Sequence, residues 1–224
     1  MGRGADPSNE GGAGPRGVEA LRADLAQAAK MEDRTERLLE VAAIVQEALE
    51  EINVHPVVVG GLAVAYWTRS QYTTTEIDFV APVTDEVKQL LADLGFERVP
   101  PRHWALPNTE IEFEIPGHFL EGGDESEEVE SRSGRKLRML SLEDIVLWRT
   151  REFLHWHDSR GFQHVLYMLE SPRLDRERLD ARAKESGLDH ALNWIYTAAD
   201  EVKQGRRFED WEIEKEAIRL EKER

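Results

Sequence analysis

The chain has 224 residues, 40% of them hydrophobic, so it is long enough for one or two domains with a real core. It contains no cysteine, which excludes disulfides, thiolate metal sites and cysteine nucleophiles. Its formal net charge of −16 opposes broad nucleic-acid binding, although a local basic pocket for one nucleotide is still allowed.

The first segment, residues 1–16, is rich in Gly, Pro and Ser and has no apolar core, so we interpret it as a disordered leader rather than a secretory signal. Apolar positions at helical spacing predict one or two helices over residues 17–53. The longest stretch without a formal charge, Asn53 to Thr68, is too short to span a bilayer. We therefore expect a cytoplasmic protein that does not enter a membrane.

Residues 54–140 contain short apolar runs and one amphipathic segment, a pattern typical of a small α/β core. The run 57–59 predicts a buried strand that ends at a pair of glycines, followed by a short helix. Further strands are expected at 77–80, 96–99, 103–106, 109–115 and 136–140, with a helix over 83–94. The acidic run from Glu121 to Glu130 is expected to be a solvated loop or a sheet edge.

From Ser141 onwards the apolar spacing becomes helical. Ser141 is a candidate N-cap, and Asp144 stands three residues later in the position of a capping-box acid. We expect a helical region over 141–204 and a charged helical tail over 205–224. The predicted fold class is therefore α+β, in which a small mixed sheet is flanked by N-terminal helices and followed by a helical half.

Two carboxylates, Glu76 and Asp78, interrupt an otherwise apolar strand. Residues i and i+2 of a strand point the same way, with Cα atoms about 6.5 to 7 Å apart, so both side chains can converge on one hard cation. Mg²⁺ prefers one or two carboxylates together with waters and phosphate oxygens. A third carboxylate is available on the polar face of 109–115, where Glu114 is the first choice and Glu112 the alternative. The competing interpretation of that face is an ordinary solvated sheet surface.

The stretch from Val57 to Val80 reads VVVGGLAVAYWTRSQYTTTEIDFV. It resembles the nucleotidyltransferase superfamily, whose fold is that of DNA polymerase β and whose motif joins a Gly-Gly or Gly-Ser turn to an Asp-x-Asp pair on the next strand. The GGLA and TTEID segments are most similar to a small prokaryotic branch that includes abortive-infection-type toxins. The segment LSLEDIVLWRTREF, from Leu140 to Phe153, also resembles that branch. Glu76 departs from the family, which has Asp there.

The resemblance implies an enzyme that uses Mg²⁺ or Mn²⁺ to move a nucleotidyl group from a nucleoside triphosphate to a hydroxyl acceptor. The acceptor is left open among a small molecule, a protein and an RNA end. The residues implied for metal binding and catalysis are Glu76, Asp78, Glu114 and, as the alternative to Glu114, Glu112. The residues that we assign to nucleotide binding are Gly60, Gly61, Arg69, Thr74 and Arg149.

The glycines and arginines have specific expected roles. Without side chains, Gly60 and Gly61 let backbone N–H groups approach a phosphate at the helix N-terminus. Arg69, just past that helix, is either a phosphate ligand or a surface charge. Arg149 borders an apolar helix face, so it either extends to solvent or enters the cleft as a triphosphate clamp.

A second hypothesis is a binding module that keeps the fold while Glu76 weakens the chemistry. Such a protein would act in a toxin–antitoxin or regulatory pair, with a protein partner or as a homodimer. His155 and His157 are expected to point apart on a helix, which argues against a shared metal ion. Five of the six tryptophans are expected in the core or an interface rather than under a nucleobase: Trp104, Trp148, Trp156, Trp194 and Trp211.

Overall fold

The computed structural model describes residues 17–120 and 122–223, so the predicted leader, residues 1–16, lies outside the described residues. Within these ranges the strands form a seven-stranded mixed sheet of order β3-β4-β5-β2-β1-β7-β6. The strands are β1 (Val57–Val59), β2 (Glu76–Val80), β3 (Glu97–Val99), β4 (His103–Ala105), β5 (Glu112–Gly117), β6 (Ser126–Glu130) and β7 (Lys136–Leu140). The combination of this sheet with flanking helices confirms the predicted α+β class.

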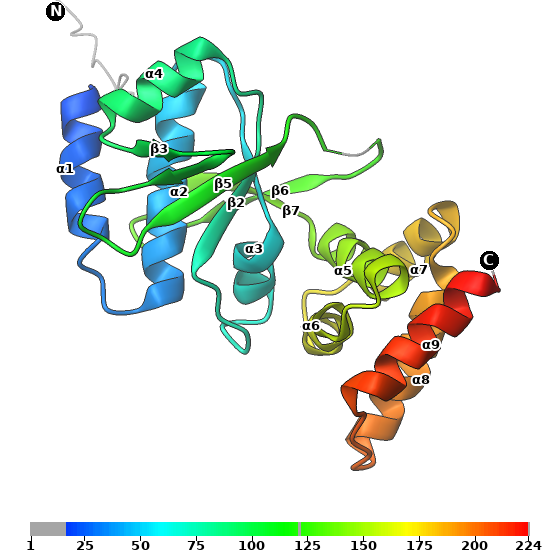
Figure 1. Ribbon diagram of the computed structural model, residues 1–224. Helices are drawn as coiled ribbons and strands as arrows, with labels where there is room; N and C mark the ends of the chain where they lie inside the picture. Colours follow the sequence, from blue (N-terminus) through cyan, green and yellow to red (C-terminus); the bar gives the residue numbers. More distant parts are fainter. Residues whose placement is uncertain (1–16, 121, 224) are drawn as a thin grey trace, which may run out of the picture.

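One face of the sheet packs against the N-terminal helices. Figure 1 shows α1 (Val18–Ala28) and α2 (Arg34–Glu50) lying along the sheet, with α4 (Asp85–Asp93) at its upper edge. Phe79 and Phe113 on neighbouring strands are fully buried and meet edge to face, 5.6 Å between ring centres. Because side chains alternate along a strand, the residues between these apolar positions point to the opposite face of the sheet.

The register of the central strands decides which polar side chains meet. β2 runs antiparallel to β1 and parallel to β5. In the parallel pair, Glu76 lies opposite Glu112 and Asp78 lies opposite Glu114. All four acidic residues therefore share the face that the N-terminal helices do not cover.

One strand differs from the sequence-based expectation, and the acidic run takes one of its two expected forms, a sheet edge. β5 begins at Glu112 rather than at Thr109, because the Thr109 hydroxyl donates to Leu106 O and accepts from Ile111 N in a tight turn. The strand also continues through Pro116, where the pairing with β2 shifts register. The acidic run contains the edge strand β6, which pairs with β7 and buries Val129.

The helical half consists of α5 (Leu142–Trp156), α6 (Ser159–Leu169), α7 (Arg176–Glu185), α8 (Asp189–Lys203) and α9 (Asp210–Lys222). Figure 1 shows these helices gathered beside the sheet, with α3 (Gly60–Trp67) between the two parts. Ser141 caps α5 as predicted, since its hydroxyl accepts from Asp144 N. No helix within the described ranges is both long and apolar enough to cross a membrane.

A buried aspartate fastens α5 to the sheet. Asp144 is fully buried and accepts hydrogen bonds from the Ser141 hydroxyl at 2.8 Å and from Glu125 N at 2.8 Å. Arg182 of α7 donates to the other carboxylate oxygen at 2.7 Å and also to Gly123 O. This charge is thus paired and hydrogen-bonded, which is what makes a buried ion tolerable.

Candidate functional site

A cleft of about 520 Å³ opens between the acidic face of the sheet and α5. We call it the carboxylate cleft. Its lining residues are Val59, Gly60, Asp78, Arg102, Glu114, Pro116, Trp148, Arg149, Arg151, Glu152, His155 and Trp156. The cleft thus combines acidic side chains, three arginines and an apolar wall, which suits an anionic ligand with an apolar part.

The glycine pair holds Asp78 at the base of this cleft. Gly60 has a φ of +63°, and a Cβ there would lie 1.9 Å from Asp78 Oδ2. Gly61 N donates to the same oxygen at 3.3 Å, and a Cβ on Gly61 would lie 2.6 Å from Thr74 Oγ1. Both glycines are therefore required by the close approach of the next strand.

Thr74 supports this turn from outside the cleft. Its hydroxyl accepts from Glu76 N at 3.3 Å, which fixes the entry into β2. It does not line the carboxylate cleft. In this conformation the predicted nucleotide-binding residue Thr74 shapes the backbone that carries the two carboxylates.

The Asp78 carboxylate has few groups that stabilise its charge. Its pKa is raised to about 6, first because burial penalises the charged form and further because Glu114 and Glu76 repel it. The hydrogen bond from Gly61 N and the charge of Arg149 act in the opposite direction but do not cancel this rise. A cation bound here would stabilise the charged carboxylate and so offset the rise in its pKa.

The other three carboxylates differ in position. Glu114 lines the cleft opposite Asp78 and is held by Arg102 Nε at 3.0 Å and His103 Nε2 at 3.1 Å. Glu76 and Glu112 share its face but are exposed and lie outside the cleft lining. The geometry thus favours Glu114 over Glu112 as the partner of Asp78.

The donor set can be compared with the needs of Mg²⁺ or Mn²⁺. Among the residues that the structure describes, no three His, Asp or Glu side chains are grouped as a ready metal site. Mg²⁺, however, needs only one or two carboxylates when phosphate oxygens complete its shell. Asp78, with Glu76 or Glu114 beside it, fits a cation that arrives together with a phosphorylated ligand.

Arg149 enters the cleft, whereas Arg69 does not. The Arg149 side chain lines the cleft beside Gly60 and is only 14% exposed. It donates through Nη1 to Glu152, and its Nε is buried without a hydrogen-bond partner in the described part of the chain. Arg69 is exposed, has a φ of +51° at the end of α3, and lies outside the cleft lining.

Several residues of the cleft were missed by sequence reasoning. Arg102 and His103 reach Glu114 because β4 pairs antiparallel with β5, and no short-range pattern indicates that pairing. Arg151 and Trp156 line the cleft because they lie on the same helix as Arg149. Helical spacing from Arg149 is the signal that would have found Trp156.

The expectation for the two histidines was wrong. α5 ends at Trp156, and His157 has a left-handed φ of +53°. Both imidazoles consequently turn to the same carboxylate, Glu221 of α9, at 3.1 Å each. The rule that such side chains point apart applies within a helix, and His157 lies beyond its end.

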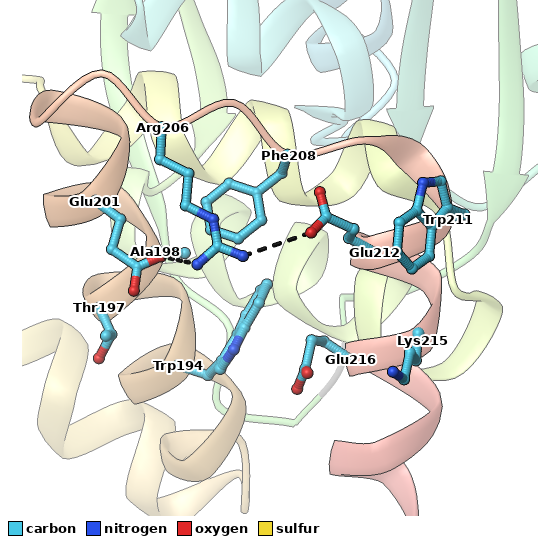
Figure 2. A pocket seen from close by; sticks show the side chains of 10 residues that line it. All are labelled: Trp194, Thr197, Ala198, Glu201, Arg206, Phe208, Trp211, Glu212, Lys215 and Glu216. Atoms are coloured by element: carbon cyan, nitrogen blue, oxygen red, sulfur yellow. Dashed lines mark hydrogen bonds and ion pairs between the residues drawn. The ribbon is translucent and has the colours of Figure 1, made fainter.

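A second hollow lies between α8 and α9, which we call the α8–α9 hollow. Its volume is about 190 Å³, and Figure 2 shows Arg206 crossing it between Glu201 and Glu212. Trp211 stands at its side and is 63% exposed. Because Arg206 already uses these carboxylates, the hollow offers less for chemistry than the carboxylate cleft.

Comparisons with known proteins bear on the fold. No protein-family model and no curated protein matches the sequence. The chain is similar to the crystal structure of an antigenic nucleotidyltransferase-like protein from Paracoccidioides brasiliensis, with a TM-score of 0.53, 15% identity, and coverage of 77% of this chain and 92% of that one. This similarity shows that the chain shares the fold of that protein.

A weaker similarity is to the solution structure of the antibiotic-resistance factor ANT(2'')-Ia. The TM-score is 0.45 and the identity 14%, over 78% of this chain and 100% of that one. A TM-score this low does not define a shared fold.

Proposed function

We propose that this protein is a metal-dependent nucleotidyltransferase that moves a nucleotidyl group from a nucleoside triphosphate to a hydroxyl acceptor. The observation that supports this most is Asp78, a half-buried carboxylate pressed against a Gly-Gly turn, with Glu114 opposite it and Arg149 across the cleft. The nucleotidyltransferase-like fold is consistent with this proposal.

In this proposal each residue of the cleft has a task. Asp78, aided by Glu76 and Glu114, would hold Mg²⁺ or Mn²⁺, which when bound neutralises phosphate charge and polarises the phosphoryl group. Arg149 and the backbone of Gly60 and Gly61 would bind the triphosphate.

Glu114 is also suited to receive a proton from the acceptor hydroxyl. His103 and Arg102 orient its carboxylate, and a base needs this kind of fixed geometry. Glu112 is exposed and lies outside the cleft lining, so it is only the second choice for this role.

The test is to incubate the protein with each labelled triphosphate and Mg²⁺ or Mn²⁺ and to search for label transfer. Glu114→Gln should lose most transfer, by about 10²- to 10⁴-fold if it serves as base. Glu112→Gln is the matched control on the same strand and should keep it. Loss in both or in neither variant would contradict the assignment of Glu114.

A binding module is the second candidate function, and the position of Glu76 supports it. Glu76 is exposed and lies outside the cleft lining, and Glu114 is already engaged by Arg102 and His103. A protein that binds triphosphate with metal but never transfers label would fit this candidate. A regulatory or toxin–antitoxin role would then be sought by isolating a partner.

A further inference from the structure

Trp156 is placed unlike the buried tryptophans of this chain. It lines the carboxylate cleft and yet is 76% exposed. Trp67 and Trp104, in contrast, are buried to within a few per cent, and the indole N–H of Trp148 donates to Asp124 at 2.8 Å. An indole left open to water at the mouth of a charged cleft has an unused aromatic face.

Helical spacing puts Trp156 in line with the arginine of the cleft. Arg149, Glu152 and Trp156 stand at positions i, i+3 and i+7 of α5, so they follow one face of the helix. Seven residues correspond to about 10.5 Å along the axis. Because the arginine and the indole are about two turns apart, a ligand held at Arg149 by its phosphates has room for a sugar before it reaches Trp156.

The end of α5 is anchored, so the backbone that carries Trp156 is held in place before a ligand arrives. His155 precedes and His157 follows Trp156, and both bind Glu221 of α9. α5 also packs against α6 and α9. With its backbone anchored, a tryptophan has only two side-chain torsions to lose when a planar group stacks on it.

We propose that Trp156 is the stacking platform for the nucleobase of the triphosphate bound in the carboxylate cleft. This inference rests on the proposed function, since it assigns the far end of the same ligand. Every base has an aromatic face, so stacking on Trp156 gives affinity without strong preference among bases. We therefore expect ATP, GTP, CTP and UTP to be affected alike.

The experiment measures binding rather than turnover, by calorimetry with Mg²⁺ present. The ligands are ATP, CTP and inorganic tripolyphosphate, which has the phosphate charge but no base. The variants are Trp156→Ala, Trp156→Phe and Trp211→Ala. Trp211 is a matched control, because it is also an exposed tryptophan but lies at the α8–α9 hollow (Figure 2).

Trp156→Ala should weaken the binding of ATP and of CTP by roughly 5- to 150-fold, which corresponds to the usual contribution of one stacked base. Tripolyphosphate binding should not change. Trp156→Phe should recover most of the affinity, and Trp211→Ala should bind every ligand like the wild type.

The outcomes separate this inference from the proposed function. If wild type binds tripolyphosphate and ATP equally well, the stacking platform is overturned while the triphosphate site stands. If Trp156→Ala weakens the binding of tripolyphosphate as much as the binding of ATP, the effect of the substitution is structural and the inference is wrong. If wild type binds none of these ligands, the proposed function fails and the inference fails with it.

Discussion

Asp144 is buried and Asp78 is half-buried, and the two aspartates differ in how many partners stabilise the carboxylate. Asp144 meets Arg182, the Ser141 hydroxyl and a backbone N–H. Asp78 has one long hydrogen bond, from Gly61 N at 3.3 Å, and two acidic neighbours that raise its pKa together with burial. The first carboxylate is completed by the fold, whereas the second is left incomplete at a cleft, as expected of a site for a cation.

The comparison predicts the largest loss of stability at the Asp144 junction. Arg182→Ala leaves a fully buried carboxylate without its cation and should lower the free energy of unfolding by about 3–5 kcal/mol. Arg219→Ala breaks only surface pairs with Glu216 and Glu223, which solvent screens, and should lower the free energy of unfolding far less. Urea denaturation of both variants is the measurement, and equal losses would contradict this account of the junction.

Gly60→Ala tests the other aspartate through its glycine. The new Cβ would clash with Asp78 Oδ2 in addition to the strain of a positive φ, so we expect a loss of about 2–4 kcal/mol. Gly134→Ala is the control, because its φ is +82° but no neighbouring atom lies within 4 Å of the position that its Cβ would take. The Gly134→Ala variant should lose only about 1–2 kcal/mol of its free energy of unfolding, from backbone strain alone. Similar thermal unfolding of the two variants would rule out a specific Gly60–Asp78 contact.

Asp78→Asn should stabilise the ligand-free protein, in contrast to Asp144→Asn. A pKa raised to about 6 means that the folded state holds the proton more tightly than the unfolded chain, whose value is 3.8. The ionised Asp78 carboxylate therefore destabilises the folded state. This loss of stability is absent below about pH 4, grows between pH 4 and 6, and is complete above pH 6. The gain for Asp78→Asn should be about 1–3 kcal/mol at pH 7 to 8 and should vanish near pH 4.

The difference between variant and wild type is the quantity to measure, because His164 titrates in the opposite sense. Burial, followed by the charge of Arg149, lowers the pKa of His164 from 6.5 to about 4, so its contribution to stability is lost as the pH falls through that range. Both proteins contain His164, and subtraction removes it. If Asp78→Asn unfolds the ligand-free protein while nucleotide binding survives, Asp78 is a structural residue.

Glu76→Asp should have the smallest effect on stability, within about 0.5 kcal/mol, because Glu76 is exposed at the start of β2. Its effect on activity should be a preserved or increased rate of transfer, since it provides the shorter side chain found at this position in the resembling family. Glu112→Asp on the neighbouring strand is the control and should leave the rate unchanged. A lower rate for Glu76→Asp would show that the longer side chain is the adapted one.

The local part of the fold was predictable from the sequence, and the long-range part was not. The strand–Gly–Gly–helix unit and the cap at Ser141 depend on neighbours within a few residues, and the structure has both. The contact of Arg182 with Asp144 spans 38 positions and has no local pattern. The same is true of His157, whose direction depends on where α5 ends and on α9.

The candidate site divides in the same way. The alternation of β2 and β5 predicts that Asp78 and Glu114 share a face, and their pairing in the structure agrees. The exposed position of Glu76 and the contact of Arg102 with Glu114 depend on how neighbouring strands pair and where β2 begins. Such features arise from tertiary packing, which residue spacing alone does not encode.

The arginines of the carboxylate cleft stand in a molecule whose formal net charge is −16. A negatively charged ligand is therefore repelled at long range and attracted only once it reaches Arg149 and its neighbours. Added salt screens charges beyond about 8–10 Å, so moderate ionic strength should speed the encounter before it weakens the bound state. The association rate constant measured by stopped flow would then rise with salt concentration, whereas electrostatic steering usually makes it fall.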